Sequence, residues 1–206
     1  MSIQIVQVNP AIDHSVRGLC IKPYPGHSKG CPNFHRKDGC PPEAPFYEDV
    51  YDLTKPVFAV VNKFNLAEHR ERMQLSNPSW SRRQLDCCLY WQPKARKQLM
   101  AGIKQFLEEN PDYHSTACPE AMGVEITKTL IPSGIVLEWP PDKYAYQVAL
   151  EGQYRKCRIC SCTWFSACPG GCNWVEQDLC NRHASFASKC DGDCINCSDR
   201  TCEGFR

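Results

Sequence analysis

The sequence predicts an α+β fold, with a small mixed sheet and helices followed by an irregular Cys-rich tail that metal staples in a treble-clef-like arrangement. Three observations predict this class. Before residue 152, β-branched segments alternate with segments of helical apolar periodicity. Ten of the sixteen cysteines lie from Cys157 to Cys202. No stretch from residue 153 onward is apolar enough to build its own core. We therefore expect two units, residues 1–152 and 153–206.

The first half of the larger unit carries two strand signals and two helix signals. Residues 3–8 are β-branched and stop at an Asn-Pro pair, which predicts a strand. Residues 18–46 are rich in glycine and proline and predict a long loop. Residues 43–53 can form a short helix, and residues 57–61 form an apolar run that predicts a buried strand. Residues 67–75 are predicted to be helical.

The second half contains the clearest helix. Residues 93–109 place Leu99, Ile103 and Phe106 on one face and stop at an Asn-Pro pair. Residues 119–130 begin with a proline, which suits a first helical turn, and predict a further helix. Residues 135–150 hold an apolar run, a Pro-Pro turn signal and an alternating run, a pattern that predicts a β-hairpin.

Composition favours a reducing compartment and metal-bound thiols. The first ten residues have neither a basic nor an apolar signal region, and the longest apolar run, Val57 to Val61, is too short to span a bilayer. We therefore expect a cytoplasmic protein without a membrane partner, where thiols favour metal over disulfides. The formal net charge of +1 treats every cysteine as neutral. Metal-bound thiolates would make it negative, so charge does not decide on a nucleic-acid partner.

Four cysteines of the larger unit form a candidate cluster site. Cys20, Cys31 and Cys40 lie in the Pro/Gly-rich loop, and Cys118 precedes a predicted helix. Three ligands in one loop and a distant fourth are a common layout for a cubane iron–sulfur cluster. Such loops leave backbone N–H groups free to point at cluster sulfurs, and a helix start stabilises a thiolate. The alternative is that these are isolated loop or core cysteines.

The segment GLCIKPYPGHSKGCPNFHRKDGCPP, followed later by CPEAMGVEITKTL, resembles a family of uncharacterised predicted metal-binding proteins of anaerobic bacteria and archaea. The resemblance covers about residues 15–140, with a central segment that does not match. Its motif is a Cys, a Cys-Pro, a Cys-Pro-Pro and a late Cys before Glu-Ala-x-Gly. Cys20, Cys31, Cys40 and Cys118 occupy those places. The resemblance implies an iron–sulfur cluster, of 4Fe-4S type, or another metal, without an established reaction.

The tail opens with a four-ligand zinc pattern. Cys157 and Cys160 form one Cys-x2-Cys pair, and Cys180 and His183 follow nineteen residues after it. Two ligands of one tight turn and two from a helix start, expected over residues 178–188, can surround one tetrahedral zinc ion. A rival arrangement leaves His183 exposed and uses another thiolate, such as Cys162, as the fourth ligand.

The other seven tail cysteines point to further metal sites. Three of them fall inside the loop of the zinc pattern and suggest a second ion, or a cluster that shares Cys157 or Cys160. The last four hold a zinc ion or an iron–sulfur cluster. Their Cys-x3-Cys-x2-Cys spacing equals that of radical S-adenosylmethionine enzymes, but those enzymes have a long barrel after it. The two sets are Cys162, Cys168 and Cys172, and Cys190, Cys194, Cys197 and Cys202.

The stretch CRICSCTWFSACPGGCNWVEQDLC resembles a Cys-rich module of phage and prophage proteins of unknown role. The usual module ends in Cys-x2-Cys, whereas this chain has His183 at the last position. The resemblance implies zinc binding and a phage or prophage origin for residues 157–183.

The sequence leaves three functions open. The first is a metalloprotein with an iron–sulfur cluster and zinc, in electron transfer with a redox partner protein or accessory to a modification reaction. The second is a zinc-stapled module that binds nucleic acid or protein through basic and aromatic residues. The third is an enzyme with an open metal position at the cysteine trio 162, 168 and 172. The basic and aromatic set comprises Arg70, Arg72, Arg82, Arg83, Lys94, Arg96, Lys97, Trp80 and Trp91.

Overall fold

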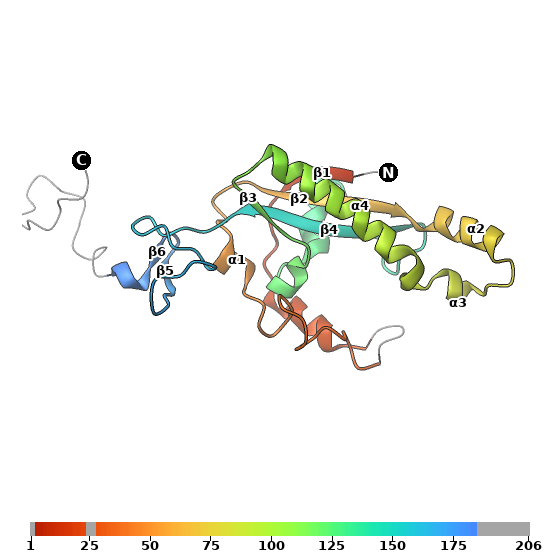
Figure 1. Cartoon of the computed structure of the whole chain (residues 1–206), viewed down its shortest axis with the longest axis horizontal. Coiled ribbons are helices and arrows are strands. Elements are labelled where there is room, and N and C mark those ends of the chain that lie inside the picture. The colour runs from red at the N-terminus through yellow and green to blue at the C-terminus, as the bar shows by residue number, and fades with distance from the viewer. Residues whose placement is uncertain (1–2, 24–27, 185–206) are drawn as a thin grey trace, which may run out of the picture. The chain divides into compact units, whose positions relative to one another are not determined.

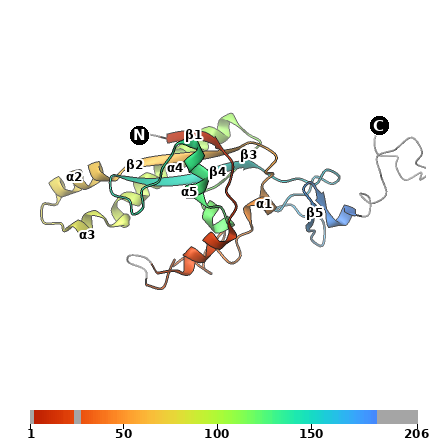
Figure 2. The ribbon, with the colours of Figure 1, turned by 180° about the vertical axis from the view of Figure 1, so that it is seen from behind.

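The computed structural model describes residues 3–23 and 28–184 and divides the chain into two units, Met1–Tyr154 and Arg155–Arg206 (Figures 1 and 2). The first unit is built on a four-stranded antiparallel sheet of order β1-β2-β4-β3. The second unit contains a two-stranded antiparallel ribbon, β5-β6. The strands are β1 (Ile3–Val8), β2 (Val57–Asn65), β3 (Tyr113–Thr116), β4 (Tyr144–Gln153), β5 (Trp174–Glu176) and β6 (Leu179–Cys180).

Helical segments cover both faces of the four-stranded sheet. Figure 1 shows α4 lying across one face, and Figure 2 shows α5 on the other. The α-helices are α1 (Tyr47–Val50), α2 (Leu66–Ser76), α3 (Arg82–Leu85), α4 (Cys88–Glu109) and α5 (Ile126–Leu130). The 3₁₀ segments are η1 (His14–Ile21), η2 (Pro119–Met122), η3 (Ile131–Ser133) and, in the second unit, η4 (Asn181–His183).

Strand β2 lies in the middle of the core because both of its faces are apolar. Val60 packs with Ile103 and Phe106 of α4. Its neighbour Val61 points to the opposite face and joins the larger cluster that contains Leu130 of α5. Successive side chains of a strand face opposite sides, so an uninterrupted apolar run is what a strand covered on both faces requires.

Several predicted elements are confirmed. Strand β1 covers the predicted residues 3–8, and α2 extends the predicted helix 67–75 by one residue at each end. The predicted strand 57–61 continues to Asn65. Helix α4 ends at Glu109 as predicted but begins at Cys88 rather than at Pro93.

Three predictions are wrong, each for a local reason. The helix predicted over residues 119–130 is split into η2 and α5, because Gly123 between them has φ 87°, a left-handed conformation that ends a helix. Residues 135–139 form no strand, and β4 pairs with β2 and β3 instead of forming a hairpin with them. Ile135 is buried in the core all the same. In the helix predicted over residues 178–188, residues 179–183 instead form strand β6 and the short η4, and residues 185–188 lie outside the described part of the chain.

In the part of the chain that the structure describes, no helix combines the length and the apolar character that crossing a bilayer requires.

Candidate metal centre

A tight turn at the start of the second unit presents the first three tail cysteines. The N–H of Ser161 donates to the carbonyl of Cys157 at 2.8 Å, and the N–H of Cys157 donates to the carbonyl of Cys162 at 3.0 Å. Ser161 has φ 58°, in the left-handed region that few residues other than glycine adopt. This reversal folds the Cys157–Cys162 segment back on itself and brings its thiols to one side.

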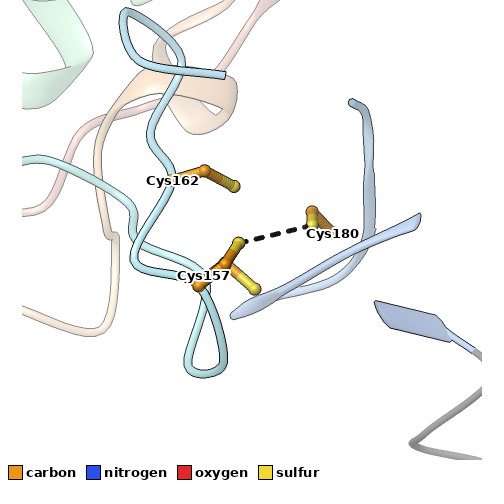
Figure 3. Close-up of side chains that lie close together, drawn as sticks. Cys157, Cys162 and Cys180 are labelled. Atoms are coloured by element: carbon orange, nitrogen blue, oxygen red, sulfur yellow. Dashed lines mark hydrogen bonds between the residues drawn. The ribbon is translucent and has the colours of Figure 1, made fainter. Parts of the chain in front are cut away.

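The ribbon β5-β6 brings the later donors to the same place. Cys180 pairs with Trp174 across the ribbon, and η4 then carries His183. The N–H of Arg158 donates to the carbonyl of Asp178 at 2.8 Å, which fixes the turn against the ribbon. Figure 3 shows Cys157 and Cys162 on one segment and Cys180 on another, with their sulfurs directed toward a shared space.

The sulfur atoms of this cluster lie close enough to one another to bind the same metal ion. Cys160 Sγ lies 3.6 Å from Cys168 Sγ and 3.9 Å from Cys180 Sγ, and the last two are 4.0 Å apart. Cys162 Sγ lies 3.6 Å from Cys172 Sγ. Three groups have all their donor atoms within 4.8 Å of one another, and each could hold a metal ion. The groups are Cys157, Cys160, Cys162 and Cys180; Cys160, Cys168, Cys180 and His183; and Cys162, Cys168, Cys172 and Cys180.

The thiols of this cluster differ in their electrostatics. Burial would raise the pKa of Cys157, but backbone N–H groups of Cys160, Cys180 and Ile159 point at its sulfur and lower the pKa to about 6. The pKa of Cys162 is raised, first by burial and then by hydrogen bonds with neighbouring thiols. So many thiols cannot all ionise side by side without a cation, and metal binding would release their remaining protons.

The structure brings most predicted tail ligands together in a regrouped form. Cys160, Cys180 and His183 lie together as predicted, but Cys168 takes the place of Cys157 in their group. The rival arrangement, with Cys162 as the fourth ligand, corresponds to the group of Cys157, Cys160, Cys162 and Cys180. Each member of the trio 162, 168 and 172 lies in at least one group. The predicted ligands Cys190, Cys194, Cys197 and Cys202 lie outside the described residues.

In the first unit, Cys40 lies within electrostatic reach of both Cys20 and Cys118, but the four candidate cysteines form no single-ion site. Burial raises the pKa of Cys20, and the nearby thiols of Cys31 and Cys40 raise it further. Surrounding protein atoms raise the pKa of Cys118 although solvent reaches its side chain; Lys37 lowers it, and Cys40 raises it again. Among the described residues, no group with all donors within 4.8 Å contains these cysteines.

Local contacts hold the loops that carry these cysteines. The N–H of Cys31 donates to the carbonyl of Cys20 at 2.7 Å. Gly30 has φ 82°, and a Cβ on it would lie 2.6 Å from that carbonyl oxygen, so only glycine fits. Arg17 donates to the carbonyls of Pro42 and Ala44 at 2.8 and 2.9 Å, which joins η1 to the end of the loop.

The raised pKa values of two carboxyl groups in this unit were not predicted from the sequence. Glu120 lies in η2, two places after Cys118, and surrounding protein atoms raise its pKa although solvent reaches the residue. Glu151 of β4 is fully buried, and burial raises its pKa to about 7 although the Ser115 hydroxyl donates to it at 2.9 Å. Glu120 stands two places after a predicted ligand, which is a signal that could have drawn attention to it. In the sequence, Glu151 directly follows the alternating run that predicts a strand, and no neighbouring motif marks it as a functional residue.

The predicted basic surface is partly neutralised. Arg70 and Arg82 both contact the carboxylates of Asp86 and Asp142, with Arg82 at 2.9 and 2.8 Å. Arg72 and Lys94 instead line a cavity of about 450 Å³ together with Lys63 and His69. Two of the predicted basic residues therefore belong to a network of ion pairs, and two others line a cationic cavity.

No family model, curated protein or solved structure matches this chain.

Proposed function

We propose that this protein is a metalloprotein that binds zinc in its Cys-rich second unit and an iron–sulfur cluster in its first unit. In this proposal it serves electron transfer or assists a modification reaction. The cluster of thiols around Cys180 supports the metal-binding part.

The spacing of the tail sulfurs supports zinc. Zinc binds thiolates at about 2.3 Å, so two corners of a tetrahedral site lie about 3.8 Å apart. The three separations among Cys160, Cys168 and Cys180 are 3.6, 3.9 and 4.0 Å. Thiolates of a cubane cluster each bind a different iron and stand farther apart, so these distances favour one shared ion. Zinc would stabilise a unit whose described part has a very small apolar interior.

The arrangement around Cys40 supports a cluster in the first unit, and this is the observation that carries the redox part of the proposal. Its thiol acts on the pKa of both Cys20 and Cys118, so it links the loop cysteines to the distant one. No compact group suited to one zinc ion joins these four thiols, so a cluster that binds each thiolate through a different iron suits them better than a single ion. Solvent reaches Cys118, so a cluster bound there would have an edge open to a redox partner.

The test is anaerobic purification of the full chain, with iron, sulfide and visible absorbance measured against protein. We expect brown protein with a broad visible absorbance and matched iron and sulfide. Cys40→Ser should lose most of the iron. The matched control is Cys88→Ser, which removes an exposed thiol at the start of α4 and should keep it. Colourless wild-type protein, or a Cys40→Ser variant with full iron content, would reject the cluster.

The cationic cavity favours a second candidate function, binding of nucleic acid or another anion. Lys63, Arg72 and Lys94 line it with a single carboxylate, Glu68, and Tyr144 adds an aromatic ring beside them. His69 is buried there, and its pKa is lowered by burial first and then by Arg72 and Lys94, as expected in a positive field. Positive charge next to aromatic rings is the combination that single strands recognise.

Titration of a labelled single-stranded oligonucleotide at several salt concentrations tests this candidate. Arg72→Ala with Lys94→Ala should weaken binding and reduce the salt dependence by about two counterions. The control is Lys104→Ala on the same helix α4, where Lys104 pairs with Glu108 at 3.6 Å. Equal affinities for all three proteins would exclude the cavity as the binding surface.

A further inference from the structure

The donor groups of the second unit overlap, and Cys180 belongs to all of them. One tetrahedral zinc ion takes four ligands, so a single ion would leave several donors of the cluster without a metal. Three buried or half-buried thiols would then lie beside the bound ion without a metal of their own. Such thiols would be difficult to ionise and would lack good hydrogen-bond partners. The donors that the overlapping groups contain are Cys157, Cys160, Cys162, Cys168, Cys172, Cys180 and His183.

Two ions account for the whole set if one donor is shared. Two four-coordinate ions need eight metal–ligand bonds, which is one more than the seven donors provide if each donor binds a single ion. An imidazole nitrogen has one lone pair for a metal, whereas a thiolate has several, so the shared donor must be a cysteine. Cys180 is the one residue common to the three groups, and it is buried at the centre of the cluster.

We propose that the second unit holds two zinc ions bridged by the Cys180 thiolate, an inference that rests on the zinc binding proposed above. The first ion takes Cys160, Cys168, Cys180 and His183, which form one compact group. Three of its donor separations, 3.6, 3.9 and 4.0 Å, match the edges of a tetrahedral zinc site.

The second ion takes Cys180 and the three remaining thiols. Cys162 and Cys172 lie 3.6 Å apart, and both share a compact group with Cys180. Cys157 shares another compact group with Cys162 and Cys180. Cys157 and Cys172 are the pair of this set that no compact group joins, so binding of the second ion would draw these two closer.

The backbone is built to send successive cysteines to alternate ions. Ser161, with φ 58°, separates Cys160 of the first ion from Cys162 of the second. Gly170 and Gly171 both have positive φ, and the N–H of Gly171 donates to the carbonyl of Cys168 at 2.8 Å. This turn separates Cys168 from Cys172, and the N–H of Cys168 lies 3.4 Å from the Cys172 sulfur. Such N–H groups stabilise ligand thiolates.

The test is the zinc content of the full chain in a background that removes the other candidate sites. That background carries Cys40→Ser and Ser at positions 190, 194, 197 and 202. We expect about two zinc ions per chain. After exchange with ¹¹³Cd, two resonances should appear, each split by the other through the shared sulfur. His183→Ala and Cys172→Ser should each reduce the content toward one ion, and Cys180→Ser should reduce both sites.

The outcomes separate this inference from the proposed function. One zinc ion per chain, or two cadmium resonances without mutual splitting, would overturn the bridged pair while zinc binding stands. Full zinc content in His183→Ala would overturn the assigned ligand set, because six thiolates would then suffice. Protein without zinc would reject the proposed function as well. Far-ultraviolet circular dichroism that matches the parent would show that each variant keeps the first unit folded.

Discussion

At the scale of single residues, Glu151 shows how a buried carboxyl couples stability to pH. It lies on the central strand β4 with an exposed fraction of 0%. Burial raises its pKa to about 7, and the hydrogen bond from Ser115 offsets only part of that rise. Between the ordinary glutamate pKa and 7, the folded state therefore holds a proton that the unfolded chain releases. The contribution to stability is greatest below this window and falls as pH rises through it.

The substitution Glu151→Gln tests this coupling. Glutamine keeps the shape but cannot ionise, so its advantage over the parent should grow as pH rises, by up to about 3 kcal/mol in the free energy of unfolding. Urea unfolding of both proteins at about pH 5 and about pH 8 measures that difference. Glu108→Gln is the control, because Glu108 is exposed on α4. The same stability gap at both pH values would show that Glu151 ionises freely.

Residue chemistry predicts the ligands of the tail better than their grouping. Cysteine density and short spacings identify Cys160, Cys180 and His183 as neighbours, and the structure places them together. Cys168 was predicted as a ligand of another ion, and its grouping with these three was not predicted, because its position depends on turns at Ser161 and at Gly170-Gly171. A left-handed serine gives no signal in the sequence, since non-glycine residues seldom adopt that conformation.

At the scale of elements, the loop that carries Cys20, Cys31 and Cys40 depends on a close approach at Gly30. A Cβ there would lie 2.6 Å from the Cys20 carbonyl oxygen, and φ 82° is unfavourable for any side chain. Gly39 has φ 77° with no atom within 4 Å of its Cβ position, and Gly18 has open space without a positive φ. Alanine would therefore meet both a steric clash and backbone strain at Gly30, backbone strain alone at Gly39, and neither at Gly18.

Gly30→Ala should therefore lose most of the iron bound by anaerobic protein, because Cys20 and Cys31 would be pushed apart. Gly39→Ala should lose about 1–2 kcal/mol of loop stability but keep its iron, and Gly18→Ala should change neither. Iron per chain and thermal unfolding of the three variants measure the two effects. Full iron in Gly30→Ala would contradict the assigned position of the cluster.

The elements that the sequence predicts well are those that local pattern decides. Helix α4 buries Leu99, Ile103 and Phe106 on one face, as its periodicity indicates. Tertiary context decides the others. Residues 135–139 have the apolar character of a strand, yet β4 finds its partners in β2 and β3, and Ile135 packs into the core without pairing. Gly123 ends η2 through its left-handed φ, which helical propensity alone does not predict.

At the scale of the whole molecule, the two units draw their stability from different sources. The first unit has apolar clusters on both faces of its sheet. In the described part of the second unit, the buried cluster consists of Leu179 and three cysteines. So small an apolar interior cannot offset the entropy of ordering the chain, whereas bound metal can.

Chelation should therefore unfold the second unit alone. Hydrogen exchange followed by mass spectrometry should show loss of protection at Cys157 and Asn181, whose N–H groups donate within the tail. Strands β2 and β4 should keep their protection. Added zinc should restore the tail, which is the control for irreversible damage by the chelator. Tail amides that stay protected without metal would show that the thiols are not needed for the fold.

X-ray absorption at the zinc edge of the anaerobically purified full chain tests the central claim, that the tail thiols bind zinc, most directly. The account predicts a first shell dominated by sulfur at about 2.3 Å, with a minor nitrogen contribution at about 2.0–2.1 Å from His183. A shell of oxygen and nitrogen without sulfur, or protein that contains no zinc, would contradict it.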